Sequence, residues 1–557
     1  MDEAFKAEMT AGYAFNEPVI DLGAPMLGDE VDPGIRIAIP LSRVNRHGLI
    51  AGATGTGKTK TLQLLAGQLS AAGVPVFAVD VKGDLSGVGA PGDPANPAVV
   101  ARTESLKFTF AAAGHPVEIM SLSGTTGAHV RASVSSFGPV LLGKVLDLND
   151  TQTSILSLVF HYCDQEKLPL LDLEDLKTTL KFLASDEAKP ILADLGGVSP
   201  ASVGVILRAI VTLETDGAAD FFGEPEFDTD DLLRTTADGK GIITLLEVAD
   251  VMDRPRLYST FVLWMLGQLY ETLPEVGDLP KPKLAFFFDE AHLLFKDASK
   301  VLLEQIERTA RLIRSKGVGV YFVTQAPTDV PSSVLGQLGN RIQHALRAFT
   351  ADDADNLRKA ARTFPMTTHY DIERTITQLG IGEAFVTVLS PKGVPTPLAA
   401  TRLLPPDSRM APLTGDEIAA LVAASPIAAR YGEAVDPESA HEIITARLTS
   451  AHAAAATAAA QNLMRNQVSP TTADGLATMT PAQQRRAVAA GERQIREAER
   501  VAERAQRAQA REQAAIEKER QRTMQTAMRT VGRVAGSRQG QSILRGILGG
   551  LFGGGKR

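Results

Sequence analysis

The stretch Gly52-Ala53-Thr54-Gly55-Thr56-Gly57-Lys58-Thr59 decides the fold of this chain. It matches the pattern G-x-x-x-x-G-K-[ST] in full, follows the apolar strand end Leu49-Ile50-Ala51, and precedes a helix predicted over residues 59–72. A glycine-rich loop in this context turns backbone N–H groups toward a polyphosphate at the N-terminus of a helix. The sequence therefore predicts a nucleotide-binding P-loop in an α/β fold.

The loop supplies a complete set of expected nucleotide contacts. Lys58 is expected to act in catalysis by reaching the β- and γ-phosphate oxygens, and the Thr59 hydroxyl to complete a Mg²⁺ site. ATP and Mg²⁺ are therefore the expected ligands. The residues expected to bind the nucleotide are Gly52, Ala53, Thr54, Gly55, Thr56, Gly57, Lys58 and Thr59.

A second motif lies at the end of an apolar strand predicted over residues 284–288. The strand is followed by two acids, Asp289 and Glu290. Asp289 is expected to hold the Mg²⁺ shell, and Glu290 to polarise the attacking water as the catalytic base. A second acid beside the metal ligand favours hydrolysis over nucleotide binding alone.

Two further predicted strands end in polar residues. The run 76–79 leads to Asp80, and the run 318–323 leads to Thr324 and Gln325. Polar side chains at the carboxyl ends of parallel strands face the ligand crevice. Gln325 is thus expected to sense the γ-phosphate or position water, and Asp80 to assist the water or the Mg²⁺ shell. A structural role in capping a loop is the alternative for each.

Hydrolysis also needs positive charge that stabilises the transition state. One arginine delivered by a neighbouring subunit would suffice, and would make hydrolysis depend on a ring. Candidates around the strand at 318–323 and the strand after it are Arg308, Arg311, Arg314, Arg341 and Arg347.

The residues Asp289-Glu290-Ala291-His292 also spell a D-E-A-H box, which raises a two-lobed helicase as an alternative. Its spacing argues against that class, because Asp289 follows Lys58 by 231 residues and the pattern Gln305, Arg308, Arg311 comes directly after the box. His292 is instead expected to start a helix near the site.

Composition limits the remaining classes. The chain has 557 residues with 44% apolar and 22% charged residues, a net charge of −8, and one cysteine, which excludes a disulfide framework. Residues 447–557 hold 19 Lys and Arg against 8 Asp and Glu, so a basic tail follows an acidic body. No secretory or membrane-spanning pattern is found, and a cytoplasmic protein without stable membrane insertion is expected.

The hydrophobic pattern divides the chain into five parts. Strands alternate with helices in most of the chain, which predicts a mostly parallel α/β sheet covered on both faces. The expected parts are a small β-rich segment (1–47), an ATPase core (48–137 and 234–404), an inserted helical subdomain (138–233), a C-terminal helical extension (405–450), and an Ala/Arg-rich helical tail with a Gly-rich apolar end (451–557).

Taken together, these motifs resemble the HerA/FtsK superfamily, and within it the bacterial HerA-like, YjgR-type proteins. The stretches that carry the resemblance are the P-loop, residues 80–84, 286–292 and 314–325, and the flanking runs 44–50, 148–152 and 335–341. The resemblance implies a RecA-like core, a hexameric ring with nucleotide at subunit interfaces, and translocation of duplex DNA. It also implies active-site roles for Lys58, Asp80, Glu290 and Gln325, with Arg314 acting on a neighbouring subunit.

The expected function is therefore that of a Mg²⁺-dependent ATPase, a DNA helicase or translocase, that couples hydrolysis to DNA translocation or remodelling as a hexameric ring. A nuclease or another protein is a possible partner, although residues 1–47 are too few for the β-barrel with which HerA proper docks its nuclease. The alternative is a nucleotide-switched ATPase that assembles or remodels a protein partner. A conjugation-type secretion ATPase is disfavoured because no membrane anchor is found. The tail's contact with DNA, a neighbouring subunit or a membrane surface is left open.

Overall fold

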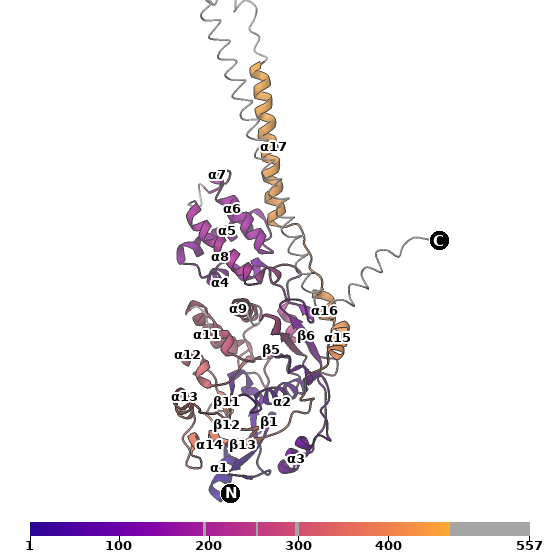
Figure 1. The fold of residues 1–557 in the computed structure, drawn as a ribbon, viewed down its shortest axis with the longest axis vertical. Helices are drawn as coiled ribbons and strands as arrows, with labels where there is room; N and C mark the ends of the chain where they lie inside the picture. Colours follow the sequence, from indigo (N-terminus) through magenta and orange to yellow (C-terminus); the bar gives the residue numbers. More distant parts are fainter. Residues whose placement is uncertain (193–196, 252–253, 296–299, 468–557) are drawn as a thin grey trace, which may run out of the picture. The chain divides into compact units, whose positions relative to one another are not determined.

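The computed structural model describes residues 1–192, 197–251, 254–295 and 300–467. The chain divides into two compact units, Met1–Ser450 and Ala451–Arg557. The predicted tail beyond residue 467, with its Gly-rich apolar end, lies outside the described residues. Figure 1 labels the elements of the first unit, which holds the sheet and the predicted site.

A mixed sheet of 13 strands forms the centre of the first unit (Figure 1), in the order β2-β1-β13-β12-β11-β4-β10-β9-β5-β8-β6-β7, with β3 also paired to β1. The strands from β11 to β7 in this order are parallel. The α/β class with a mostly parallel sheet is confirmed. The strands are β1 (Val19–Leu27), β2 (Glu30–Val31), β3 (Ile37–Pro40), β4 (Gly48–Ala51), β5 (Val76–Asp80), β6 (Val117–Ser121), β7 (Ala128–His129), β8 (Ile243–Glu247), β9 (Leu284–Phe288), β10 (Val318–Thr324), β11 (Asn340–His344), β12 (Glu383–Thr387) and β13 (Ala399–Leu403).

The central strands are buried on both faces, which explains their nearly continuous apolar sequences. On β9, Phe286 and Phe288 belong to one hydrophobic core, and Ala285 and Phe287 to a second core on the opposite face. This division follows from the two-residue period of a strand. The sheet therefore separates two apolar layers.

Helices cover both faces of the sheet. Helix α2 contributes Leu62 and Leu65 to the core that holds Phe287, and α9 contributes Phe261 and Trp264 to the core on the other face. The helices are α1 (Glu3–Tyr13), α2 (Lys58–Ala71), α3 (Pro97–Leu106), α4 (Val134–Val145), α5 (Asp150–Glu166), α6 (Leu173–Leu183), α7 (Lys189–Leu192), α8 (Pro200–Thr215), α9 (Pro255–Thr272), α10 (His292–Phe295), α11 (Lys300–Ile313), α12 (Ser332–Leu335), α13 (Ala351–Ala361), α14 (Ile372–Gln378), α15 (Gly415–Ala424), α16 (Pro426–Tyr431) and α17 (Ala440–Gln467).

The region between β7 and β8 is helical, with helices α4 to α8 in succession. Its buried side chains, such as Leu156, Leu176 and Ile206, join the same hydrophobic core as α9 and β9. The insertion therefore extends the core on one face of the sheet. Within the described residues, no helix is both long and apolar enough to cross a membrane.

The first residues of the chain differ from the expected β-rich segment. Strands β1 to β3 lie there, but they follow a helix, α1, that the sequence analysis did not predict. The Asp2 side chain caps this helix by accepting a hydrogen bond from the Phe5 N–H at 2.7 Å. Phe5, Met9 and Tyr13 recur every four residues and are buried on one side. This stripe packs the helix onto the core that also holds α2.

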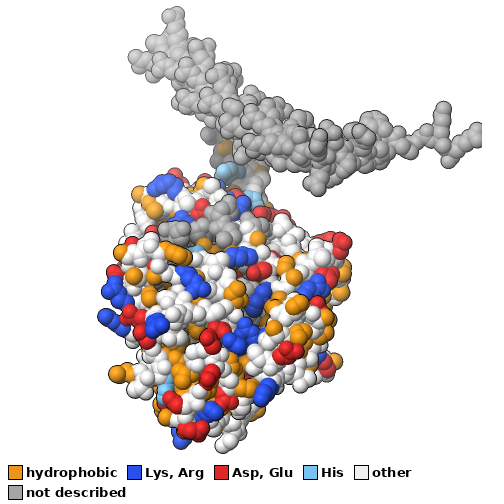
Figure 2. All heavy atoms as spheres, turned by 60° about the horizontal axis from the view of Figure 1, so that its bottom comes forward, with side chains coloured by type: hydrophobic (Ala, Val, Ile, Leu, Met, Phe, Trp, Pro, Cys, Tyr) orange, Lys and Arg blue, Asp and Glu red, His pale blue; other side chains and the backbone are white. Residues whose placement is uncertain are grey.

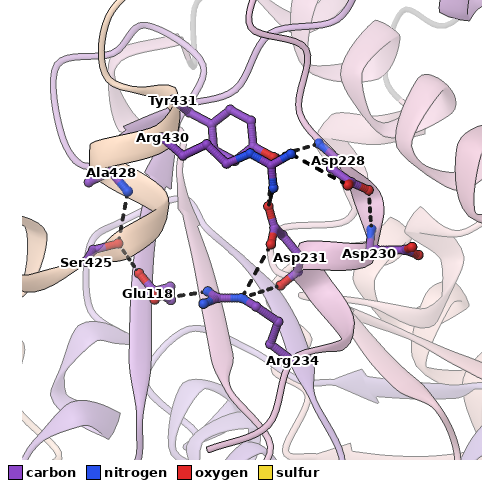
Figure 3. Close-up of polar contacts among 9 residues, drawn as sticks. All are labelled: Glu118, Asp228, Asp230, Asp231, Arg234, Ser425, Ala428, Arg430 and Tyr431. Atoms are coloured by element: carbon purple, nitrogen blue, oxygen red, sulfur yellow. Dashed lines mark hydrogen bonds and ion pairs between the residues drawn. The ribbon is translucent and has the colours of Figure 1, made fainter.

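A polar cluster joins the C-terminal extension to the sheet (Figure 3). Glu118 of β6 accepts hydrogen bonds from Arg234, at 3.0 Å, and from the hydroxyl of Ser425. The Ser425 hydroxyl also accepts the Ala428 N–H at 3.0 Å, which caps the start of α16. Glu118 thereby connects a strand of the sheet to the first turn of α16.

The other end of α16 is held by one carboxylate in the same cluster (Figure 3). Asp231 Oδ2 accepts hydrogen bonds from Tyr431 at 2.7 Å and from Arg430 at 3.0 Å. The carbonyl of Tyr431 accepts a further bond from the buried Arg131 at 2.9 Å. Residues from three distant parts of the chain therefore satisfy one another's hydrogen-bonding groups. We call this group the α16 clamp; its members are Glu118, Arg131, Asp231, Arg234, Ser425, Arg430 and Tyr431.

The α16 clamp should contribute measurably to stability. Replacing Asp231 by Ala leaves the hydroxyl of the buried Tyr431 and the Arg430 guanidinium without their shared acceptor. We expect the free energy of unfolding to fall by about 1–3 kcal/mol, measured by urea denaturation. Glu433→Ala, an exposed substitution beside α16, should change it by less than about 0.5 kcal/mol. Equal effects of the two variants would contradict a specific role for the clamp.

Candidate active site

The P-loop connects the end of β4 to the start of α2. Gly52 and Gly57 have φ angles of +156° and +112°, which side chains rarely adopt. A Cβ atom on Gly52 would also lie 2.4 Å from the Cβ of His344 on β11. Glycine is therefore required where the loop leaves the strand and where it enters the helix.

Neighbouring strands hold the P-loop in place. The Ala53 N–H donates to the carbonyl of Ala345, directly after β11, at 2.8 Å. The carbonyl of Thr56 accepts the N–H of Gly382, directly before β12, at 3.0 Å. These bonds fix the middle of the loop from outside it, as a preformed anion site requires.

Lys58 is the first residue of α2, and Thr59 follows it. The Lys58 ammonium donates to the carbonyls of Gly52 and Ala53 at 2.7 and 3.2 Å. Burial lowers its pKa, while the nearby carboxylates of Glu290 and Asp289 act in the opposite direction. The lysine predicted to bind phosphate therefore lies near the charges of the predicted catalytic base, Glu290, and the predicted metal ligand, Asp289.

The sheet register brings the predicted residues to one edge. Strand β10 lies between β4 and β9, with Thr324 opposite Ala51 and Phe322 opposite Phe288. The three strands are parallel, so the P-loop, Gln325 and Asp289 begin at the same edge. The structure thus places Lys58, Gln325, Asp289 and Glu290 together, as expected for one site.

The two acids after β9 are both buried, with exposed fractions of 4% for Asp289 and 5% for Glu290. Burial and the neighbouring Glu290 carboxylate raise the pKa of Asp289 to about 7. The Glu290 N–H donates to Asp289 Oδ1 at 2.9 Å, and Glu290 has a φ of +45°. Such strained backbone at a non-glycine residue is characteristic of functional sites.

Glu290 is held by cationic and polar neighbours. One oxygen forms an ion pair with Lys82, and the other lies 3.3 Å from His292 Nδ1. Burial alone would raise the pKa of Glu290, but Lys82, followed by His292 and Gln325, lowers it overall. His292 does begin α10 beside the site, as the sequence predicted.

Asp80 lies at the end of β5 with its carboxylate directed at its own loop. Oδ1 accepts the backbone N–H groups of Lys82, Gly83 and Asp84 at 3.2, 2.8 and 3.2 Å, and Oδ2 accepts that of Leu85 at 2.8 Å. Burial raises its pKa to about 6 despite these bonds. This is the loop-capping geometry of the structural alternative, and a direct catalytic role for Asp80 stays a prediction.

Arg314 is not brought to this site. It begins a 3₁₀ turn, Arg314–Lys316, that precedes β10, whereas Gln325 follows the other end of that strand. A strand of 7 residues spans about 20 Å. Arg314 is exposed, and its charge helps burial to lower the pKa values of Arg46 and His47 nearby. Within one chain, Arg314 and the P-loop lie at opposite edges of the sheet.

The sequence analysis assigned no role to Lys82 or His344. Lys82 pairs with Glu290 because β5 lies beside β9. His344 ends β11 and contacts the Thr61 hydroxyl of α2 at 2.9 Å. Lys82 carries a partial signal in sequence, since it lies two residues beyond a strand-ending aspartate. Glu290 could not be identified as its partner from the sequence, because the order of the strands in a sheet does not follow from the local sequence pattern.

The residues present fit ATP and Mg²⁺. The P-loop offers backbone N–H groups and the Lys58 ammonium to phosphate oxygens, and the Thr59 hydroxyl and Asp289 are hard oxygen donors of the kind Mg²⁺ prefers. The buried Asp289 carboxylate, whose pKa is raised by burial, would be stabilised as an anion by a cation. Glu290 Oε2 is also buried without a hydrogen-bond partner.

The chain matches one family of known proteins. Residues 27–557 match the family described as helicase HerA-like C-terminal. No curated relative matches the chain by sequence.

Several solved structures are similar in fold. The bacterial conjugative coupling protein TrwBdeltaN70, in an unbound form, is 14% identical, with 71% of this chain and 91% of that chain covered and a TM-score of 0.47. The plasmid coupling protein TrwB in complex with ADP and Mg²⁺ has the same identity and coverage and a TM-score of 0.46. VirB4 of Thermoanaerobacter pseudethanolicus is 13% identical, with 70% and 98% covered and a TM-score of 0.40.

The family match spans nearly the whole chain and includes every residue of the predicted site. The resemblance drawn from the sequence motifs is therefore confirmed. The chain belongs to the HerA-like family of P-loop ATPases.

Proposed function

We propose that this chain is a Mg²⁺-dependent ATP hydrolase that forms a homo-oligomeric ring of six subunits and uses hydrolysis to translocate or remodel duplex DNA. The observation that carries the hydrolase assignment is the meeting of Lys58, Asp289 and Glu290 at one edge of the sheet. At this edge Lys58 is placed to bind phosphate, Asp289 to bind the metal and Glu290 to activate water.

Each residue has a defined part in the proposed reaction. Lys58 binds the β- and γ-phosphate oxygens, and Thr59 and Asp289 would hold Mg²⁺, which neutralises phosphate charge when bound. Glu290 accepts a proton from the attacking water while the water oxygen bonds to the γ-phosphorus and the bond to the bridging oxygen breaks. Gln325, which lies close enough to help lower the pKa of Glu290, orients that water. The products are ADP and phosphate.

The position of Arg314 supports a ring. It is exposed at the edge of the sheet opposite the chain's own P-loop, so it cannot stabilise the transition state in the same chain. In a ring of identical subunits with nucleotide at the interfaces, this edge of one subunit faces the P-loop edge of the next. Arg314 then supplies in trans the positive charge that phosphoryl transfer needs.

The charge distribution favours a second candidate for the substrate. On the face shown in Figure 2, Lys and Arg side chains are intermingled with Asp and Glu. Binding to duplex DNA depends on phosphate contacts from clustered basic side chains. An ATPase that remodels a protein partner, with the same hydrolytic residues, is therefore the alternative to DNA translocation.

Steady-state ATPase measurements distinguish these candidates. The rate per subunit should rise with protein concentration as rings assemble, and linear duplex DNA should raise it several-fold at about 50 mM salt and less at about 200 mM, because salt weakens phosphate contacts. A rate indifferent to DNA at both salt concentrations would favour the protein-remodelling function. A rate independent of protein concentration would contradict assembly-dependent hydrolysis.

Two substitutions separate binding from hydrolysis. Lys58→Ala should abolish ATP binding, because the loop loses its only side-chain cation. Glu290→Gln should retain ATP binding and lower kcat by at least about 100-fold, because the base is lost. Equilibrium binding of a fluorescent ATP analogue and single-turnover hydrolysis measure the two effects. Retained turnover in Glu290→Gln would remove Glu290 as the base.

A mixing experiment tests Arg314. Arg314→Ala should bind ATP normally and lower kcat by about 10³-fold. Mixing it with Glu290→Gln protein should restore part of the activity, because some interfaces then combine an intact Glu290 with an intact Arg314. Arg208→Ala, an exposed substitution on α8, should leave kcat unchanged. If mixing restores no activity, Arg314 does not act in trans.

A further inference from the structure

The loop after β5 carries Lys82 and is held by the buried carboxylate of Asp80. Four backbone N–H groups of residues 82–85 converge on the buried carboxylate of Asp80. Gly83, with a φ of +71°, allows the tight turn. The backbone of the loop is therefore rigid, and the Lys82 side chain leaves it at a fixed point.

The side chain of Lys82 differs sharply in exposure from that of its partner. Lys82 is 53% exposed, whereas Glu290 is 7% exposed. Glu290 is also fixed through its backbone, because its carbonyl accepts the Leu293 N–H at 2.9 Å and its N–H donates to Asp289 at 2.9 Å. In this ion pair, the glutamate is stationary and the lysine, on a flexible four-carbon stem, is free to move.

The ion pair occupies the oxygen that the proposed reaction needs. Lys82 bonds to Glu290 Oε1, and His292 lies 3.3 Å from Oε2. Oε2 is buried and has no hydrogen-bond partner, so Oε1, which faces the half-exposed Lys82, is the oxygen that an attacking water can approach. Lys82 must therefore leave Oε1 before Glu290 can act as a base.

A phosphate group offers Lys82 an alternative partner. The lysine follows β5 and contacts the residue that follows β9, and both strands run parallel to β4, which leads into the P-loop, so all of these loops begin at the same edge of the sheet. A γ-phosphate bound by Lys58 would bring additional negative charge to this site. An ammonium group binds phosphate oxygens as a point charge, without the geometric demands of a guanidinium.

We propose that Lys82 is a positioning residue that senses the γ-phosphate: it holds Glu290 by an ion pair in the nucleotide-free chain, transfers to the γ-phosphate of bound ATP, and so releases Glu290 Oε1 for the attacking water. ADP lacks the γ-phosphate, so the ion pair is retained when ADP is bound. This inference rests on the proposed ATP hydrolase function and adds to it a control of the base by the substrate.

The test compares two nucleotides that differ in the γ-phosphate. The full-length protein is titrated, in the presence of Mg²⁺, with AMP-PNP and with ADP, using displacement of a fluorescent ADP analogue. Lys82→Gln should weaken AMP-PNP binding by about tenfold and change ADP binding by less than about twofold, because it removes one charge-assisted hydrogen bond to phosphate. Lys82→Arg should restore most of the AMP-PNP affinity.

A matched control changes the same charge without touching the ion pair. Lys60 lies on the first turn of α2 and donates to the carbonyl of Met410. Lys60→Gln should leave the ratio of AMP-PNP to ADP affinity unchanged. Retained ADP binding in each variant shows that the P-loop is folded.

The outcomes separate this inference from the proposed function. An unchanged affinity ratio in Lys82→Gln would overturn the transfer of Lys82 to phosphate, and so would equal weakening of both nucleotides, which indicates a general effect of charge or structure. Either result leaves ATP hydrolysis by the wild-type chain intact. A wild-type chain that binds neither nucleotide would instead remove the proposed function, and with it this inference.

Discussion

The parallel hydrogen-bond ladder of β4, β10 and β9 is the constraint on which the site depends. In that ladder Thr324 lies opposite Ala51 and Phe322 opposite Phe288. The loops that follow the three strands must therefore begin at one edge. A shift of the register by one residue would turn every side chain of the strand to the opposite face, which the two separate cores of the sheet do not permit.

Burying two adjacent carboxylates costs free energy, and neighbouring charged and polar residues offset part of that cost. Burial and mutual repulsion disfavour ionisation of Asp289 and Glu290 together. Lys82 provides the nearest positive charge, and the raised pKa of Lys82 follows first from its hydrogen bond to Glu290. Asp80 contributes indirectly, because its carboxylate organises the loop that carries Lys82. The charge balance of the site therefore extends over two neighbouring strands.

The parts of the structure that were predictable have local signatures. The P-loop is recognisable from eight consecutive residues, and β9 has the predicted bounds because an apolar run ends sharply at two acids. Helix α1 was missed because its three buried residues form a stripe only when read at helical spacing. The pairing of Lys82 with Glu290, 208 residues apart, depends on β5 lying beside β9. No local pattern indicates such a neighbour, and the same holds for the contacts of Asp231 with α16.

Strand β10 carries Gln325 directly after one end and Arg314 shortly before the other. Its interior is buried on both faces and bonded to neighbours on both sides, so it moves as a stiff rod. In a closed ring, such a rod links the γ-phosphate of one interface to the arginine of the next. In the proposed ring, sites connected in this way would not turn over independently, and a single inactive subunit would disturb its neighbours in one rotational direction only. Directionality around the ring would then arise from the polarity of one β-strand.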